Sequence, residues 1–290
     1  MEFAFEDDVF DSPRVRNLQV ETSYNAKICE SEWFIITTTS DDPEEKMMLQ
    51  KYQGDYHYMK SDFRCALEDY GRCLNLAPKS ATSVQRDCME GMSRCCLYLG
   101  RYDEALKHSE MLKTLSTNCD HRVAVWMLRS EIYNRTGNTI EESAALCRCL
   151  LVRSWTSDHW HRLSRCYLGL MGSRGDSSNL AFKTGACLLK TRILYQGALS
   201  GNQSFAKVRN CKALAEIEEL VETLQLPEDF VARALSEFEK EGEVVNAVES
   251  DEESDSLLLL RMTAAEVILM FEARWFSWIA RHEHSSGKQC

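Results

Sequence analysis

Apolar residues recur every three or four positions along most of this 290-residue chain, in segments of helical length. That spacing places apolar side chains on one face of an α-helix, whereas a half-buried strand would alternate apolar and polar residues. With only 13 glycines and 4 prolines, the chain also has few of the turns that an all-β protein needs. We therefore predict an all-α protein, with helices at residues 46–60, 64–76, 84–99, 103–115, 122–136, 140–152, 156–171, 179–199, 204–224, 228–241 and 257–282.

A 34-residue repeat lies within this helical pattern. Trp126, Ser130 and Tyr133 are followed 34 positions later by Trp160, Ser164 and Tyr167. This period, and this order of an aromatic, a small and a second aromatic residue, are those of the first helix of a tetratricopeptide (TPR) repeat, although serine replaces the usual glycine or alanine. The segment thus resembles the TPR family.

Two earlier segments resemble the other half of the repeat, which is the turn and the start of the second helix. The better match centres on Ala66, with Gly54 12 residues before it and Tyr70 4 residues after it, and Ala105 marks the other. A single pair of helices keeps an apolar face that it cannot bury alone, so neighbouring pairs must stack. The fold class that we predict is a TPR-like α-solenoid of antiparallel helix pairs with a C-terminal apolar helix.

The chain divides by composition into five regions. Acidic and polar tracts near the start surround an aromatic island at Trp33 and Phe34, which we expect to dock on the first helices. Farther along, a loop rich in glycine and serine follows the recognisable repeats, and an acidic stretch precedes the last helix. We predict a mostly disordered acidic arm at 1–45, about four TPR-like repeats at 46–171, a degenerate helical continuation at 172–245, an acidic linker at 246–256 and a C-terminal helix at 257–284.

The last predicted helix is apolar on more than one face. The terminal helix of a solenoid should instead have a polar outer side. Two interpretations stay open. The helix caps the core of the stack, or Trp275, Phe276 and Trp278 form part of a partner interface, where aromatic residues are enriched.

Charge and composition limit the kinds of partner and the cellular compartment that we expect. The chain has 34 Lys and Arg against 45 Asp and Glu, and its net charge of −11 disfavours nucleic acid and anionic membranes. Its start lacks the parts of a signal peptide, and its longest apolar stretch, Leu257–Phe271, is too short to cross a bilayer. The 13 scattered cysteines suit a reducing compartment. We expect an intracellular protein, cytoplasmic or nuclear, with no nucleic-acid partner and no membrane partner.

The sequence offers little for catalysis. It contains no glycine-rich phosphate loop, nucleophile elbow or zincin motif. Cys147 and Cys149 lie two positions apart on one predicted helix, as do His159 and His161, so the members of each pair point in different directions and match a metal site poorly. We expect no enzyme, no cofactor and no metal site, and a metal-dependent or thiol enzyme is the weakest alternative.

The first helices of TPR repeats line a concave groove, which is where a partner would bind. An arginine from each of three successive units could grip a carboxylate-bearing or phosphorylated peptide, although such positions can also be ordinary solvated faces. Of the five residues that clamp the acidic tails of heat-shock proteins in TPR co-chaperones, only Lys51 has a counterpart, so we do not expect that function. The candidate groove residues are Lys51, Tyr58, Arg94, Tyr98, Arg135, His161 and Arg165.

We therefore predict a non-catalytic scaffold or adaptor that binds a segment of a partner protein in the concave groove. In the alternative, the chain regulates itself, because the acidic linker at 249–256 occupies the basic wall of the groove until a partner displaces it.

Short segments along the chain also resemble an uncharacterised vertebrate family whose human member is known as an open reading frame on chromosome 8. They are residues 26–34, 54–55, 100–101 and 275–276. The resemblance implies common ancestry, and the family brings no activity, cofactor or partner that could be transferred.

Overall fold

The computed structural model describes residues 32–36, 40–171, 177–200, 206–247 and 252–279, and the chain forms two units, 1–38 and 39–290. All regular elements in the described ranges are α-helices, which confirms the predicted fold class. The first unit contributes α2 (Trp33–Ile36), in which the rings of Trp33 and Phe34 meet edge to face. Docking of these two rings stays a prediction, and most of the expected arm lies outside the described residues.

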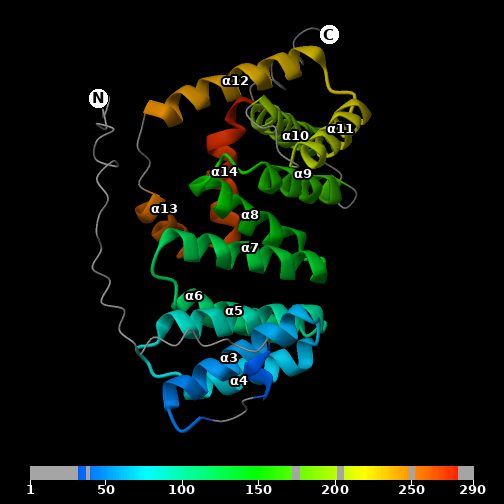
Figure 1. Cartoon of the computed structure of the whole chain (residues 1–290). Helices are drawn as coiled ribbons and strands as arrows, with labels where there is room; N and C mark the ends of the chain where they lie inside the picture. Colours follow the sequence, from blue (N-terminus) through cyan, green and yellow to red (C-terminus); the bar gives the residue numbers. More distant parts are fainter. Residues whose placement is uncertain (1–31, 37–39, 172–176, 201–205, 248–251, 280–290) are drawn as a thin grey trace, which may run out of the picture. The chain divides into compact units, whose positions relative to one another are not determined.

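The second unit begins with four consecutive pairs of helices. The two helices of a pair pack against each other, and each pair packs against the next (Figure 1). This arrangement is that of a TPR-like solenoid. The pairs are α3 (Pro43–Met59) with α4 (Phe63–Leu76), α5 (Thr82–Tyr98) with α6 (Tyr102–Thr114), α7 (Cys119–Thr136) with α8 (Thr139–Val152), and α9 (Ser157–Met171) with α10 (Ser177–Ser200).

Two glycines let the first and second pairs approach closely. The ring of Tyr70 in α4 packs between Gly54 in α3 and Gly91 in α5, and a Cβ atom at these glycines would come within 2.8 and 2.6 Å of it. The Tyr70 hydroxyl donates a hydrogen bond to Asp55 Oδ1 at 2.9 Å. Glycine is therefore required at both positions by packing and not by a turn.

The 34-residue repeat corresponds to two equivalent environments. Trp126 in α7 and Trp160 in α9 are both buried and belong to one hydrophobic core. The equivalent serines are also buried, and each donates to the carbonyl three residues earlier, Ser130 to Met127 at 2.7 Å and Ser164 to His161 at 2.6 Å. The serine hydroxyl is thus satisfied within its own helix, which is why serine can replace the usual alanine or glycine at a helix crossing.

The chain after the four pairs continues as helices that cover the end of the stack. Both α11 (Ala206–Thr223) and α12 (Glu228–Ala247) pack on α10. The last two helices fold back along the repeats: α13 (Glu252–Leu259) packs on α7 and α8, and α14 (Ala264–Trp275) packs on α8 (Figure 1).

The single helix predicted at 257–282 is wrong, because the chain breaks between α13 and α14. Thr263 starts α14 with a capping box, in which its hydroxyl accepts from the Glu266 N–H at 3.3 Å and Glu266 accepts from the Thr263 N–H at 2.7 Å. The expected acidic linker is helical from Glu252 onward. Residues 248–251 and 280–284 lie outside the described residues.

Candidate functional site

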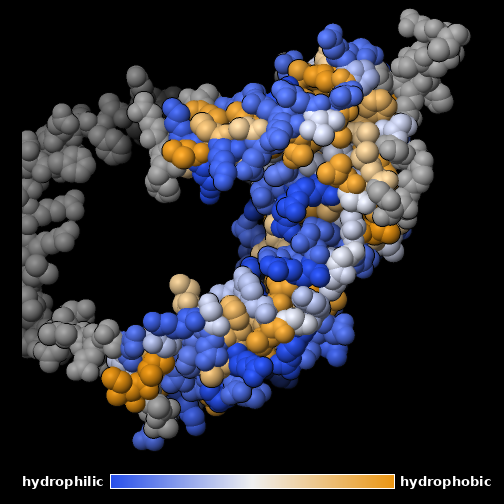
Figure 2. All heavy atoms as spheres, turned by 90° about the vertical axis from the view of Figure 1, so that its right-hand side faces the viewer, coloured by the Kyte–Doolittle hydropathy of each residue, from blue (hydrophilic) through white to orange (hydrophobic). Residues whose placement is uncertain are grey.

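A pocket of about 550 Å³ lies between α7 and α9 on the side of the stack formed by first helices. Its walls come from the last turns of α7, the start of α8 and most of α9. Figure 2 shows a hollowed face of the helical unit, and the side chains around the hollow are mostly hydrophilic. The pocket is lined by Glu131, Asn134, Arg135, Gly137, Thr139, Glu142, Asp158, His161, Arg162, Arg165, Cys166 and Gly169.

The turn between α7 and α8 is fixed by its own sequence. Gly137 ends α7 with a φ of 71°, in the left-handed region that favours glycine. The next residue, Asn138, caps α8 by accepting a hydrogen bond from the Glu141 N–H at 3.3 Å. This turn places Glu142, in the first turn of α8, beneath Asn134 and Arg135 of α7.

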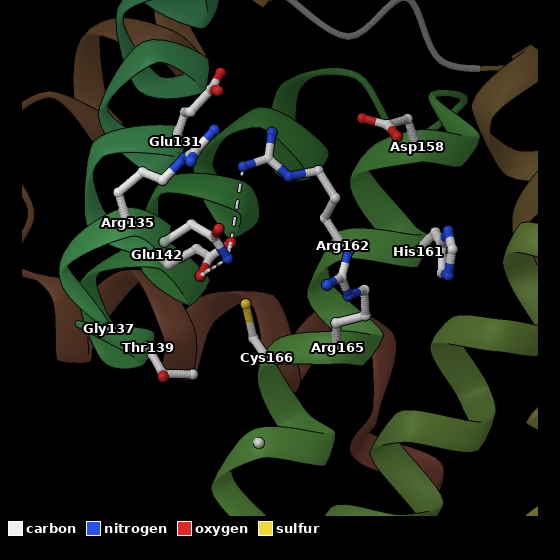
Figure 3. Close-up of a pocket in the computed structure, with 12 residues that line it drawn as sticks. Glu131, Arg135, Gly137, Thr139, Glu142, Asp158, His161, Arg162, Arg165 and Cys166 are labelled. Carbon is white, nitrogen blue, oxygen red and sulfur yellow. Dashed lines mark hydrogen bonds and ion pairs between the residues drawn. The ribbon is translucent and has the colours of Figure 1, made fainter. Parts of the chain in front are cut away.

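A buried carboxylate forms the base of the pocket. The two oxygens of Glu142 each accept from Asn134 Nδ2 at 3.1 Å, and Arg162 Nη2 lies 3.7 Å from Glu142 Oε1 (Figure 3). Arg162 also donates to Ser130 Oγ at 3.0 Å. The charge of Glu142 is therefore already balanced within the protein.

Arg135 and Arg165 lie above this base and have no partner in the described part of the chain. Arg135 from α7 and Arg162 from α9 point toward one another across the pocket, and Arg165 lies one turn farther along α9 (Figure 3). Neither Arg135 nor Arg165 makes a hydrogen bond or an ion pair within the described residues. An unpaired guanidinium offers parallel N–H donors that match a carboxylate or a phosphate.

The rim of the pocket carries further charges. Glu131 and Asp158 add two carboxylates to the lining, so the pocket mixes both signs of charge. His161 points away from the arginines (Figure 3). Burial, and secondly the charge of Arg165, lower the pKa of His161, so its imidazole is neutral at physiological pH. The positive charge available to a ligand therefore comes from arginine and not from histidine.

A second pocket, of about 290 Å³, lies between α3 and α5. It contains Lys51, Tyr58 and Arg94, but both of its cations are paired. Lys51 Nζ lies 2.8 Å from Asp55 and 3.7 Å from Asp87, and Arg94 Nη2 lies 2.7 Å from Glu90. This pocket therefore has less free positive charge than the pocket between α7 and α9.

An aromatic ledge adjoins the second pocket. The rings of Phe63 and Tyr98 stack with their centroids 4.5 Å apart, and the Tyr58 ring lies 6.2 Å from Tyr98. Tyr98 remains 49% exposed. Burial, and then the neighbouring Tyr98, raise the pKa of Tyr58 to about 12, so the Tyr58 hydroxyl is neutral. The ledge offers flat apolar surface rather than charge.

The structure thus distributes the seven predicted groove residues over two places. Arg135, His161 and Arg165 line the pocket between α7 and α9. Lys51, Tyr58 and Arg94 line the pocket between α3 and α5, and Tyr98 stacks beside it. The three arginines expected to act as one basic row therefore do not share a pocket, and Arg94 is neutralised by Glu90, its neighbour one turn earlier.

Sequence reasoning missed Arg162, which contacts Glu142 at the base of the pocket between α7 and α9. A signal for it was present. Arg162 and Arg165 lie three positions apart on one helix, a spacing that puts both side chains on the same face. Glu142 gave no comparable signal, because an acidic residue in the first turn of a helix is ordinary.

The C-terminal aromatic residues lie in the core. Trp275, Phe276 and Trp278 are buried, and Trp275 packs against Trp160 and Phe271. These rings are unavailable to a partner in this arrangement, which favours the capping interpretation over the interface interpretation.

The acidic linker also lies elsewhere than expected. Its described residues contact α7 and α8 through Arg122 and Arg153, not through the groove arginines. The self-regulation hypothesis placed residues 249–256 on the basic wall of the groove. The described residues of this segment instead contact Arg122 and Arg153. Residues 249–251 lie outside the described residues.

The described ranges contain neither a cluster of metal ligands nor a helix suited to crossing a membrane. No group of three or more His, Cys, Asp or Glu side chains in them could hold a metal ion. None of their helices combines the length and the apolar character that crossing a bilayer requires.

Comparison with known proteins places the chain among uncharacterised relatives. The model of a family of unknown function, DUF5588, matches residues 1–179. The human protein described as uncharacterized protein C8orf76 is 32% identical over 166 residues, and its rat homologue is 30% identical over 164 residues. In both cases the match covers 57% of this chain and 44% of the relative, so the chain spans less than half the length of these relatives.

A solved structure of the MamA protein is also similar to this chain. The two are 16% identical in sequence, with a TM-score of 0.43, and the alignment covers 69% of this chain and 96% of the other.

Proposed function

This chain belongs to the family of unknown function DUF5588, and we propose that it is a non-catalytic scaffold or adaptor that binds an acidic segment of a partner protein in the pocket between α7 and α9. The observation that carries the proposal is the pair of guanidinium groups of Arg135 and Arg165, which have no partner among the described residues and lie above a base whose own charges are balanced.

The chemistry of the pocket favours a carboxylate as the central group of the ligand. Arginine forms short, charge-assisted hydrogen bonds with carboxylates, and a bidentate pair also fixes the direction of the ligand. Glu131 and Asp158 on the rim can accept hydrogen bonds from the backbone N–H groups of a bound segment. The same two carboxylates repel a doubly charged phosphate more strongly than a singly charged carboxylate.

A mixed-charge pocket also suits an adaptor better than an enzyme. The His161 imidazole points away from the arginines, and the nearby Cys166 is a neutral thiol, because burial raises its pKa to about 12. These groups offer neither a base near a substrate nor an activated nucleophile.

The proposal can be tested by charge reversal of Arg135 and Arg165. We expect the double variant Arg135→Glu and Arg165→Glu to lose the proteins that co-purify with the tagged wild-type chain from cells. A matched control is Arg64→Glu with Lys107→Glu, which changes the net charge equally at exposed positions on second helices. Far-UV circular dichroism checks that both variants keep their helices.

The same set of co-purified proteins in the wild type and in the pocket variant would exclude this pocket as the binding site. A loss that is equal in the control would show that overall charge, and not the pocket, determines binding. A bound set that resists 0.5 M salt would argue against an ionic contact, because salt at that concentration screens exposed charges beyond a few ångströms.

A further inference from the structure

The start of α7 holds a pair of carboxylates from α13. Cys119 is the first residue of α7, and its backbone N–H donates to Glu253 Oε2 at 2.8 Å. The N-terminus of an α-helix carries unpaired N–H donors and the positive end of the helix dipole, so it attracts anions. Glu253 thus contacts the most positive end of this helix.

Two arginines complete this anion site. Arg122 is 1% exposed, forms an ion pair with Glu253 and donates from Nε to Ser256 Oγ at 2.9 Å. Arg153, which follows the last residue of α8, lies between two carboxylates, with Nη2 2.5 Å from Asp120 Oδ1 and 3.3 Å from Glu252 Oε2. We call the Cys119 N–H, Arg122 and Arg153 the α7 anion site. A buried guanidinium without a counter-charge is strongly destabilising, so Arg122 requires an acidic occupant when the site is closed.

The apolar contacts of α13 are few compared with these polar ones. Its eight residues include the start of a leucine run, yet Leu257 is 47% exposed and Leu258 is 53% exposed. Only Leu259 is buried among the three leucines in the helix. A helix this short is not stable alone in water, so α13 depends on its docking site for its structure.

The following helix is held independently of α13. The aromatic side chains of α14 pack into the core around Trp160, and Arg148 fixes the junction before α14 by donating to the carbonyls of Leu259, the last residue of α13, at 3.3 Å and of Met262 at 2.8 Å. Loss of the contacts of Glu252 and Glu253 would therefore release α13 without removing α14 from the core.

We propose that the α7 anion site is a binding site for acidic helical segments, and that α13 is its internal occupant. The external ligand is a partner segment with two adjacent carboxylates and a hydroxyl residue three positions after the second, the pattern of Glu252, Glu253 and Ser256. Such a segment takes the place of α13 on α7 and α8, and its apolar side takes the position that Leu259 fills in the closed chain. The site is separate from the pocket between α7 and α9, and this inference does not rest on the function proposed for that pocket.

A peptide that copies the internal occupant provides the probe. We expect a fluorescent peptide of residues 249–260 to bind the full chain carrying Glu252→Gln and Glu253→Gln at least tenfold more tightly than it binds the wild type, because the wild-type site is filled. Adding Arg122→Gln to that variant should abolish binding. A peptide with glutamine in place of the two glutamates should bind neither protein.

A second variant tests the same idea without altering the two glutamates. Ser256 is fully buried against Arg122, whereas Ser254 in the same helix is exposed. Ser256→Leu replaces the hydroxyl that accepts from Arg122 with a larger apolar group, and it should release α13 and allow the peptide to bind. Ser254→Leu should leave the site closed. Hydrogen exchange of the first-turn amides of α7 reports on release in both variants, and the bound peptide should restore their protection.

Three results would overturn the proposal. They are equal peptide affinity for the wild type and the glutamine variant, binding that survives Arg122→Gln, and full protection of the start of α7 in Ser256→Leu. Binding of a second copy of the chain, detected as a dimer at increasing concentration, would show that the external occupant is α13 of another molecule and would also support the site.

Discussion

The indole rings of Trp160 in α9 and Trp275 in α14 meet edge to face, with their centroids 4.9 Å apart and an interplanar angle of 81°. Trp160 also contacts Phe238 in α12 and Phe271 in α14, so three helices that are distant in sequence share one aromatic cluster. The last helix therefore completes the core of the recognisable repeats, as a cap on the open apolar face of a solenoid must.

Truncation of this cluster should destabilise the fold. Trp275→Ala removes a fully buried indole, and such substitutions lower the free energy of unfolding by about 3–5 kcal/mol. Trp155→Ala is the matched control, because Trp155 is 55% exposed and should change stability by less than about 1 kcal/mol. Urea unfolding monitored by circular dichroism measures both. Equal effects of the two substitutions would contradict the capping role of α14.

The glycines around Tyr70 give a second prediction. Gly54→Ala and Gly91→Ala place a methyl group against the Tyr70 ring, and overpacking of this kind costs about 1–3 kcal/mol. Gly71→Ala should instead stabilise by about 0.5–1 kcal/mol, because it lies within α4 and nothing approaches within 4 Å of its Cβ position. Thermal unfolding of the three variants should give shifts of opposite sign. A stabilising Gly91→Ala would show that Tyr70 can move without cost.

The repeats could be predicted because their determinants are local. Gly54, Ala66 and Tyr70 lie within one helix pair, and their spacing reflects one helix crossing. The break between α13 and α14 was also local, since Thr263 and Glu266 have the spacing of a capping box, but the continuous apolar run concealed it. Helix periodicity alone does not reveal where one helix ends and another begins.

The sites were harder to predict because their pairings are not local. Arg135 and Arg165 were identified from their positions on first helices, yet nothing in the sequence distinguished them from Arg94, which is neutralised one turn away by Glu90. The contacts of Arg122 and Arg153 with Glu252 and Glu253 join helices separated by about one hundred residues or more. Such pairings depend on where α13 packs. The spacing of residues in a single sequence does not reveal that position.

The buried and the exposed cysteines should differ strongly in their rates of alkylation. Burial raises the pKa of Cys149 to about 12 and that of Cys147 well above its usual range, so these thiols should not react with iodoacetamide in the folded chain. Cys211 is exposed and should react quickly. Cys65 is also exposed, but its hydrogen bond with Asp62 raises the pKa of its thiol and should slow its alkylation.

A single substitution tests the cause of the slow reaction at Cys65. Asp62→Asn keeps a good N-cap for α4 but removes the negative charge, so alkylation of Cys65 at pH 8 should become faster while that of Cys211 stays unchanged. Peptide mass spectrometry after timed labelling measures each site. An unchanged rate at Cys65 would assign its protection to something other than the Asp62 carboxylate.

Buried histidine should make the fold sensitive to mild acid. Burial, assisted by Arg162 and partly opposed by Asp158, lowers the pKa of His159, and its Nδ1 atom is buried without a hydrogen-bond partner in the described part of the chain. The unfolded chain therefore binds a proton more readily than the folded chain as the pH falls through the ordinary histidine pKa of about 6.5. The stability contributed by neutral His159 is present above that pH and is lost below it.

His159→Leu should remove this part of the pH dependence. Between about pH 7 and pH 5 the free energy of unfolding of the wild type should fall more steeply than that of the variant, by up to about 1.4 kcal/mol per pH unit for one proton. Urea unfolding at a series of pH values measures the difference. Parallel curves for the two proteins would mean that His159 gains a proton in the folded state as easily as in the unfolded one, which its burial beside Arg162 argues against.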